Sequence, residues 1–229
     1  MVMEMAPSEK VSALLKVRRE MGNCSLCQLR EGRFNIVFGE GNPFADLMLI
    51  GEGPGVCEDG LGRPFVGKSG ELLDKALAHN DLTRDDVYIA NLVKCRPPGN
   101  RNPTITELGL CTPFLYEQIK VIAPKCIVTL GKVAAEYLLK RNVKITQERG
   151  MTFRCYDFPH IFLIPTLHPS YILRNGGKGK GGLYYDIEHG LEQASLGLTP
   201  DQWEEALYQD WMESNKEYYE KRRKCPHLY

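Results

Sequence analysis

The sequence lacks an excess of charge of either sign. Its 229 residues include 29 Lys and Arg and 29 Asp and Glu, so the formal net charge is zero. This balance excludes a strong global field, and a nucleic acid would have to meet a local basic face. No apolar run approaches the roughly 18 residues that would span a bilayer, and the start, Met1–Pro7, has no signal-peptide pattern. We therefore expect a cytoplasmic protein without a membrane partner.

Internal repeats are also absent, and the length suits one sizeable core. The sequence does contain eight cysteines. In a reducing compartment such thiols are more often metal ligands or buried groups than disulfides. Cys24 and Cys27 form a C-x2-C pair, whereas Cys95 and Cys111 lie far along the chain. One centre with sulfur ligands can tie these three segments together.

Four short apolar runs, at 47–50, 87–90, 127–130 and 161–164, recur at wide spacing. They do not alternate with polar residues, which is typical of strands buried on both faces. Helical patterns separate the runs, with expected N-caps at Ser8, Ser69 and Thr104 and further helices at 133–139 and after Gly182. This alternation predicts an α/β fold with a mostly parallel sheet and helices on both faces.

The C-terminal part is expected to be separate from this domain. We place the main domain at residues 1–196 and a helical extension at 197–229. The segment Thr199–Gln202 has the pattern of a helix start, with a proline in its first turn. Trp203, Leu207 and Trp211 follow at helical spacing and form one stripe, which favours a helix that packs on the domain over a partner site.

Unusual residues follow the predicted strands. In open parallel sheets, ligands bind beyond the carboxyl ends of the strands. Those ends carry Gly51–Gly55, Asn91, Gly131 and Thr166–Pro169. We therefore expect the functional site at this edge of the sheet.

The segment Gly62–Ser69 matches the phosphate-binding pattern G-x-x-x-x-G-K-[ST]. A phosphate loop must follow a strand directly and leave its N–H groups free. Here the strand is expected to end near Glu52, Pro64 removes one donor, and Phe65 places a large ring in the loop. These departures argue against nucleotide hydrolysis.

Taken together, several segments resemble the family 4 (iron–sulfur) uracil-DNA glycosylases. The resemblance covers about residues 20–195. The matching segments are Gly51–Gly55, Glu58–Asp59, Gly62–Gly70, Asn91–Pro98 and His168–Arg174. It implies a three-layer α/β/α sandwich with a short, mainly parallel central sheet, in which residues 1–196 form the glycosylase domain with an N-terminal cluster-binding arm.

The resemblance also implies a [4Fe–4S] cluster on Cys24, Cys27, Cys95 and Cys111. Four thiolates alone would also suit zinc. The other four cysteines are expected to be buried thiols; they are Cys57, Cys126, Cys155 and Cys225.

The implied activity is that of a monofunctional glycosylase. It flips uracil out of DNA and hydrolyses the N-glycosidic bond to leave an abasic site, as in base excision repair of deaminated cytosine. The amide of Asn91 has the carbonyl and NH2 groups that complement N3–H and O4 of uracil, whereas cytosine would leave two mismatches. The resemblance makes Phe65 the stacking platform and places Glu58 near the position of a thymine methyl group.

His168 is suited to donate a hydrogen bond to uracil O2 as the leaving charge develops. The backbone of Glu52 and Gly53 is expected to face the base. Another family of the superfamily has an aspartate at the Gly53 position to position water, and this chain lacks it. The water is therefore expected to be held either by Glu52, the nearest carboxylate, or mostly by backbone groups. Val56 and Cys57 depart from the acidic residues expected in this loop. The remaining histidines, His79, His160, His189 and His227, are expected to be structural.

The segment Ser170–Arg174 resembles the wedge loop of the superfamily. Leu173 can fill the space that the flipped base leaves, while Ser170 and Arg174 contact the DNA backbone. Further candidate contacts to phosphates are cationic; they are Lys68, Arg96, Arg101, Lys178 and Lys180. We expect a monomer that acts on uracil-containing DNA.

Two alternatives remain. One is a relative that captures uracil in DNA through a histidine in a basic loop, but the matching loop Gly99–Pro103 has no histidine. The other is a nucleic-acid-binding iron–sulfur protein without turnover, which would not account for Phe65, Asn91 and His168 together.

Overall fold

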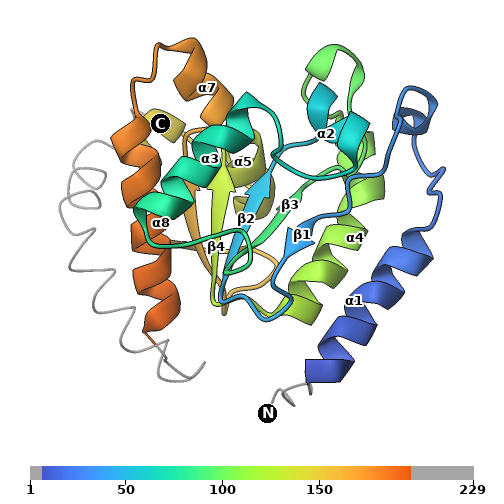
Figure 1. Cartoon of the computed structure of the whole chain (residues 1–229), viewed down its shortest axis with the longest axis horizontal. Coiled ribbons are helices and arrows are strands. Elements are labelled where there is room, and N and C mark those ends of the chain that lie inside the picture. The colour runs from blue at the N-terminus through green and yellow to red at the C-terminus, as the bar shows by residue number, and fades with distance from the viewer. Residues whose placement is uncertain (1–6, 197–229) are drawn as a thin grey trace. The chain divides into compact units, whose positions relative to one another are not determined.

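The computed structural model describes residues 7–196 (Figure 1). The chain divides into two units, Met1–Ser195 and Leu196–Tyr229. The predicted C-terminal helix with Trp203, together with Cys225 and His227, lies outside the described residues. Within the described part, no helix is long and apolar enough to cross a membrane.

The centre of the fold is a six-stranded sheet with the order β1-β3-β2-β4-β6-β5. Four strands are parallel to one another and buried along their whole length; they are β2 (Leu47–Gly51), β3 (Tyr88–Asn91), β4 (Cys126–Leu130) and β6 (Phe162–Thr166). Two-residue strands, β1 (Glu40–Gly41) and β5 (Phe153–Arg154), pair antiparallel at the two edges. The predicted α/β fold with a mainly parallel sheet is confirmed.

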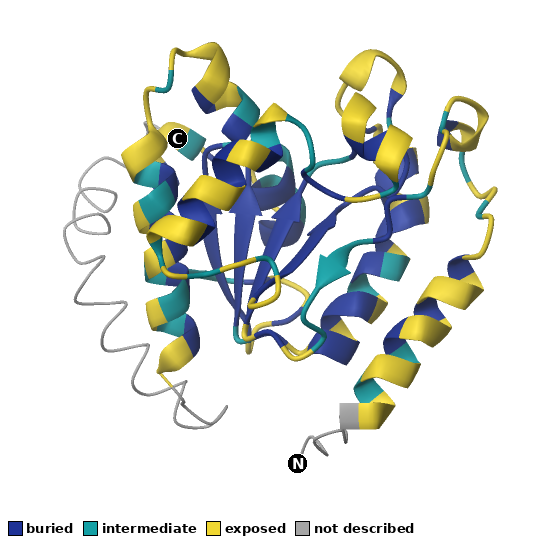
Figure 2. Cartoon of the chain, viewed as in Figure 1, coloured by how far each residue is buried: buried dark blue, intermediate teal, exposed yellow. Residues whose placement is uncertain are grey.

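Helices cover both faces of the sheet, and their outer sides are exposed (Figure 2). One face is covered by α1 (Pro7–Met21), α4 (Ile105–Ile122) and α5 (Lys132–Leu139), and the other by α3 (Lys68–His79) and α8 (Lys180–Ser195). Adjacent residues of a strand point to opposite faces, so Met48 and Ile50 join the core under α1 and α4. Helix α8 lies close to the other face, where an added Cβ at Gly190 would come within 2.7 Å of Val128.

One of the three predicted N-caps is confirmed, and it is the N-cap of α4. Thr104 and Glu107 form the predicted capping box of α4, with Thr104 Oγ1 accepting from Glu107 N at 3.2 Å. The predicted N-caps at Ser8 and Ser69 are wrong by a short shift. Helix α1 already includes Pro7, and the N-cap of α3 is Gly67.

Short elements complete the described chain. They are η1 (Gln28–Glu31), α2 (Val56–Leu61), η2 (Pro98–Asn100), α6 (Ile145–Glu148) and α7 (Pro169–Arg174). The segment expected as a wedge loop is therefore helical. The phosphate-loop pattern follows α2 rather than a strand, which removes the context that a nucleotide-binding loop requires.

Candidate functional site

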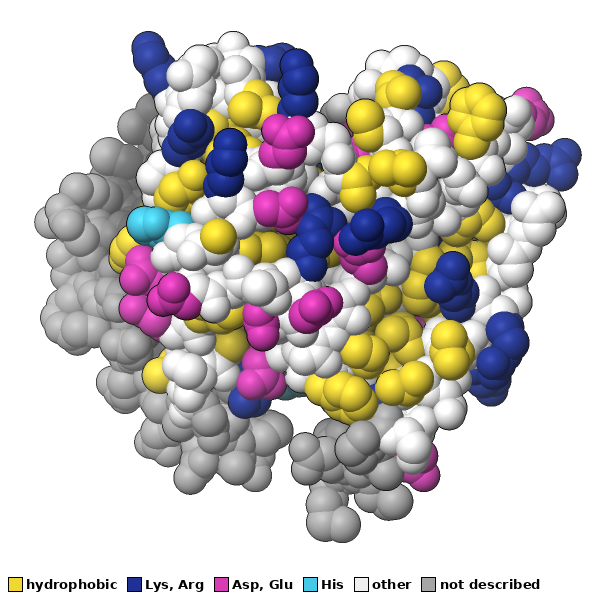
Figure 3. Space-filling model, viewed as in Figure 1, with side chains coloured by type: hydrophobic (Ala, Val, Ile, Leu, Met, Phe, Trp, Pro, Cys, Tyr) yellow, Lys and Arg dark blue, Asp and Glu magenta, His cyan; other side chains and the backbone are white. Residues whose placement is uncertain are grey.

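The carboxyl ends of β2, β3 and β6 border a cleft of about 430 Å³. Most of the residues predicted for the site line this cleft; they are Glu52, Gly53, Glu58, Phe65, Lys68, Asn91, Arg101, His168, Ser170 and Arg174. Arg96 and Leu173 are not among the lining residues. Lys and Arg side chains stand on both upper lobes of the surface, on either side of a hollow (Figure 3). The sheet thus gathers side chains that are far apart in the sequence.

Asn91 ends β3 at the base of the cleft and is only 1% exposed. Its Oδ1 is buried and has no hydrogen-bond partner. A buried polar atom is rarely left unpaired in a folded protein. The empty acceptor therefore suits a ligand that brings an N–H donor.

Gly51 lies opposite Asn91 in the parallel register of β2 and β3. An added Cβ at Gly51 would lie 2.5 Å from Asn91 Oδ1 and 2.5 Å from Phe65 Cζ. Any larger residue would therefore displace both side chains. Glycine is required here by close approach rather than by backbone conformation.

Phe65 forms a wall of the cleft although its backbone is strained. Its φ is +51°, a left-handed conformation that a bulky residue rarely adopts. The residue is only 5% exposed, and its ring centroid lies 6.0 Å from that of His168. An aromatic face is thus fixed beside Asn91 and His168.

His168 is the N-cap residue of α7. Its Nδ1 accepts a hydrogen bond from Ser170 N at 3.1 Å and lies 2.8 Å from Ser170 Oγ. Because a backbone N–H can only donate, the proton of the neutral ring must be on Nε2. Burial, together with the nearby charge of Arg174, lowers the pKa of His168 to about 4, and Glu58 opposes part of this shift. His168 is therefore a neutral donor at pH 7.

Glu52 and Gly53 follow β2 at the same end of the sheet. Burial raises the pKa of the Glu52 carboxyl. The backbone carbonyl of Glu52 accepts from Val93 N at 3.2 Å, which fixes this segment against the end of β3. An added Cβ at Gly53 would come within 2.8 Å of Val93 Cγ2. Glu52 and Glu58 are the acidic residues among those that line the cleft.

The carboxylate of Glu58 is bound to backbone on both oxygens. Oε1 accepts from Val66 N and Gly67 N, both at 2.9 Å, and Oε2 accepts from Gly55 N at 3.1 Å. Glu58 therefore fixes the loop that carries Phe65, besides lining the cleft.

The predicted DNA-contacting cations differ in how they are held. Lys68 is exposed at the first residue of α3. Arg101 forms a two-pronged ion pair with Glu107 at 2.8 and 2.6 Å. Arg174 Nη1 donates to Ser170 Oγ at 3.2 Å. Arg96 Nε donates to Asn100 Oδ1 at 2.8 Å. Lys178 and Lys180 are exposed beyond α7.

The four cysteines predicted as ligands line one separate cavity, which also has apolar walls. Cys24 and Cys27 come from the segment after α1, Cys95 follows β3, and Cys111 lies in α4. Arg33 Nη1 lies 3.3 Å from Cys95 Sγ, within donor distance. The backbone N–H of residue 94 donates to Cys111 Sγ at 3.2 Å. These contacts suit sulfurs that carry negative charge.

The donor set of this cavity is four cysteine sulfurs. Four thiolates suit either a [4Fe–4S] cluster or a zinc ion. Within residues 7–196, no three His, Cys, Asp or Glu side chains are grouped closely enough to hold one metal ion. Burial raises the pKa of Cys111 to about 11 and also raises that of Cys95, so both are thiols at neutral pH without bound metal.

The predicted burial of the other described cysteines is confirmed for two residues and is wrong for one. Cys126 and Cys155 are fully buried, as predicted. The prediction for Cys57 is wrong, because this residue is exposed in the first turn of α2 and lines the cleft. The loop after Cys95 contributes Asn100 and Asn102 to the cleft, and neither was predicted. The concentration of Gly, Pro and Asn in that loop was the available signal.

Known proteins are similar to this chain over most of its length. Residues 38–186 match the model of the uracil DNA glycosylase superfamily. The type-4 uracil-DNA glycosylase of Thermotoga maritima is 45% identical over 160 residues, which cover 69% of this chain and 82% of that protein. That of Sulfurisphaera tokodaii is 42% identical over 171 residues, 72% and 78% of the two chains. That of Saccharolobus solfataricus is 45% identical over 163 residues, 68% and 75%.

Proposed function

Because the chain belongs to the uracil-DNA glycosylase superfamily, we propose that it is a monofunctional uracil-DNA glycosylase that acts in DNA repair. It removes uracil from DNA by hydrolysis of the N-glycosidic bond and leaves an abasic site. The observation that carries this proposal is the unpaired, buried Oδ1 of Asn91, which lies at the base of a cleft beside Phe65 and His168.

Base recognition follows from the amide of Asn91. Its Oδ1 accepts from N3–H of uracil, and its NH2 group donates to O4. Cytosine has an acceptor at N3 and a donor at C4, so both contacts would be mismatched in a buried site. Such mismatches reject the wrong base far more strongly than a missing methyl contact does. Phe65 stacks on the flipped ring, and Glu58 and the Gly53 backbone border it.

Bond cleavage transfers the electron pair of the C1′–N1 bond to the uracil ring, where the charge spreads partly to O2. The neutral His168 donates Nε2–H to this oxygen. A preorganised donor of this kind contributes about 3–4 kcal/mol to the transition state. Water adds to the oxocarbenium-like C1′ and loses a proton, the uracil anion takes up a proton, and the products are an abasic sugar and free uracil. The Glu52 carboxylate is the candidate that orients this water.

DNA binding is assigned to the rim of the cleft. Lys68, Arg101, Ser170 and Arg174 line the cleft. Leu173 is 39% exposed on α7, and its proposed role is to enter the space left by the flipped nucleotide. Arg96 contributes from the loop after β3. These cations provide a local basic face on a chain with no net charge.

The cofactor that the cysteines would hold is a [4Fe–4S] cluster, bound by Cys24, Cys27, Cys95 and Cys111. Bound there, it would supply structural cross-linking rather than a step on uracil. We further propose residues 1–196 as the glycosylase domain with this arm, 197–229 as a helical extension, a monomeric state and a cytoplasmic location.

The test uses a labelled oligonucleotide with one uracil, followed by alkaline cleavage. The expected result is cleavage at uracil and none at thymine or cytosine in matched oligonucleotides. Asn91→Ala and His168→Ala should each slow the reaction at least about 100-fold. A stable complex that releases no uracil would instead support the alternative of a binding protein without turnover.

A further inference from the structure

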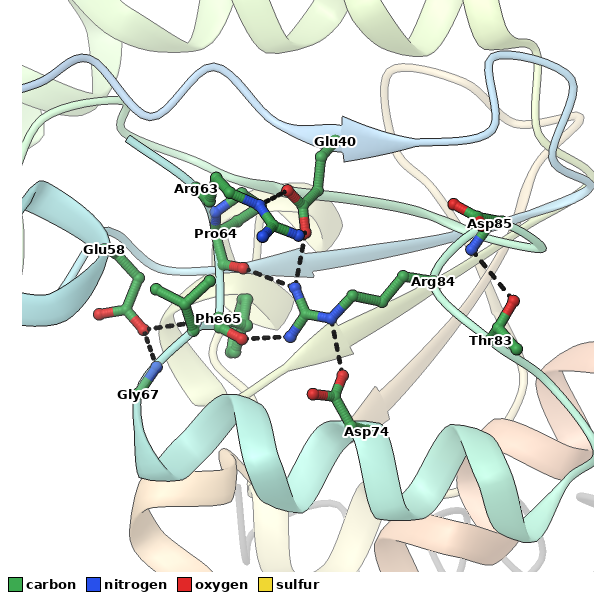
Figure 4. A network of polar contacts seen from close by, with 11 residues as sticks. Glu40, Glu58, Arg63, Pro64, Phe65, Gly67, Asp74, Thr83, Arg84 and Asp85 are labelled. Atoms are coloured by element: carbon green, nitrogen blue, oxygen red, sulfur yellow. Dashed lines mark hydrogen bonds and ion pairs between the residues drawn. The ribbon is translucent and has the colours of Figure 1, made fainter. Parts of the chain in front are cut away.

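Arg84 lies in the loop before β3 and points toward the loop that carries Phe65 (Figure 4). Its side chain is only 19% exposed. Its guanidinium donates to the carbonyl of Pro64 at 2.9 Å and to the carbonyl of Phe65. Two carboxylates hold it in place, Glu40 from β1 and Asp74 from α3, both at 2.7 Å.

Glu58 binds the same loop from the opposite side. Its Oε1 accepts from Val66 N and Gly67 N. The peptide group between Phe65 and Val66 therefore has its carbonyl on the cation of Arg84 and its N–H on the anion of Glu58. A trans peptide points these two groups in opposite directions. The orientation of this one peptide group is thus fixed by charge at both ends.

This peptide group matters because Phe65 has a positive φ. Residues in sparsely populated backbone conformations persist only where the surroundings hold them there. The space on the helix side is already filled, since an added Cβ at Gly70 would lie 1.7 Å from the Phe65 carbonyl oxygen. Arg84 satisfies that carbonyl in the left-handed conformation. Another conformation of Phe65 would turn the carbonyl away from the guanidinium.

We propose that Arg84 is a positioning residue for catalysis: it holds Phe65 in the conformation in which the ring can stack on the flipped base. This inference rests on the proposed glycosylase function. Arg84 does not line the cleft, so it acts through Phe65 and not on the substrate.

The test is a double-mutant cycle with Arg84→Met, Phe65→Ala and the combined variant, measured as uracil release under single-turnover conditions. Each single variant should lose roughly 10- to 100-fold in rate at saturation. Because Arg84 acts through Phe65, the combined variant should be about as slow as Phe65→Ala alone. The KM for DNA should change much less, since the basic rim is intact.

Two further variants separate positioning from stability. Arg84→Lys keeps the charge but cannot bind both carbonyls in the planar geometry of a guanidinium, so its rate should be intermediate. Arg84→Lys also takes the place of Arg84→Met in the mutant cycle if Arg84→Met does not fold. Arg141→Met is the matched control, because Arg141 has an ion pair of 2.6 Å with the nearly buried Glu148 and lies outside the cleft. It should lower thermal stability and leave the rate unchanged.

The outcomes keep the two proposals apart. An active wild-type protein whose two single losses multiply in the double variant would overturn the role of Arg84 and leave the glycosylase function standing. A rate for Arg84→Met equal to that of wild type would do the same. No uracil release by the wild-type protein would refute the proposed function itself.

Discussion

Replacement of Asn91 by Leu should preserve or raise the stability of the protein and nearly abolish its activity. Leucine has the same branched skeleton as asparagine but no polar atoms. The substitution removes the buried Oδ1 that has no partner, and an unsatisfied buried acceptor costs about 1–3 kcal/mol. Part of this gain is offset because Leu is bulkier than Asn. We expect the free energy of unfolding to stay unchanged or to rise by up to about 2 kcal/mol.

The same substitution should nearly abolish uracil release. Both hydrogen bonds to the base are lost, and N3–H and O4 would be buried without partners. A site built around such hydrogen bonds discriminates by about 10⁴-fold, so we expect a loss of that order. The assays are urea unfolding followed by fluorescence and single-turnover release of uracil.

Thr129→Val is the matched control for this experiment. Thr129 Oγ1 is also buried without a partner, and Thr129 lies in β4 outside the cleft. This variant should gain stability in the same way and keep full activity. A rate of Asn91→Leu within tenfold of wild type would refute the assignment of Asn91 to base recognition. A loss of more than about 2 kcal/mol would show that its amide has a structural role in the free protein.

Three other predictions follow from the site. The pKa of His168 is lowered from 6.5 to about 4, so the unfolded chain takes up the proton first as pH falls. The contribution of the neutral His168 ring to stability is therefore full above pH 6.5 and is lost as pH falls toward 4. Titration of the ring by NMR should give a midpoint near 4, and a midpoint above 6 would contradict this. Gly51→Ala should cost about 1–3 kcal/mol in urea unfolding and most of the activity, because its Cβ would meet Asn91 and Phe65 at 2.5 Å; a stable, active variant would disprove the close approach. Cys111→Ser should lower the iron content and the melting temperature together, and full iron content would exclude Cys111 as a ligand.

The central strands were predictable because their signal is local. Each is a continuous apolar run, and the observed bounds differ from the predicted ones by at most two residues. The edge strands β1 and β5 were missed because they are two residues long and only half-buried. Helix α7 was expected as a loop, although His168 and Pro169 have the pattern of an N-cap followed by proline. The capping box at Thr104 was visible because both of its partners lie within four residues.

The positions of site residues were predictable only for residues that lie at the ends of parallel strands. Asn91 and His168 follow parallel strands, so the topology brings them to one edge. Arg84 was not predicted, because its partners come from β1, α3 and the loop of Phe65, which meet only in the folded chain. The exposure of Cys57 was missed for the same reason. Its neighbours in sequence do not show that the first turn of α2 faces the cleft.

The segment between Asn91 and Cys95 connects the residue proposed for base recognition to the cysteine cavity. Three successive N–H groups hold this segment: those of residues 92 and 93 donate to the carbonyls of Gly51 and Glu52 at 2.9 and 3.2 Å, and that of residue 94 donates to Cys111 Sγ. Four residues of extended chain span at most about 14 Å, so Asn91 and Cys95 are joined by one short stretch whose N–H groups at residues 92–94 are all hydrogen-bonded. A cluster bound there would act on uracil only through this backbone. It would fix the position of the Asn91 amide relative to Gly51 and need not exchange an electron or a proton with the base.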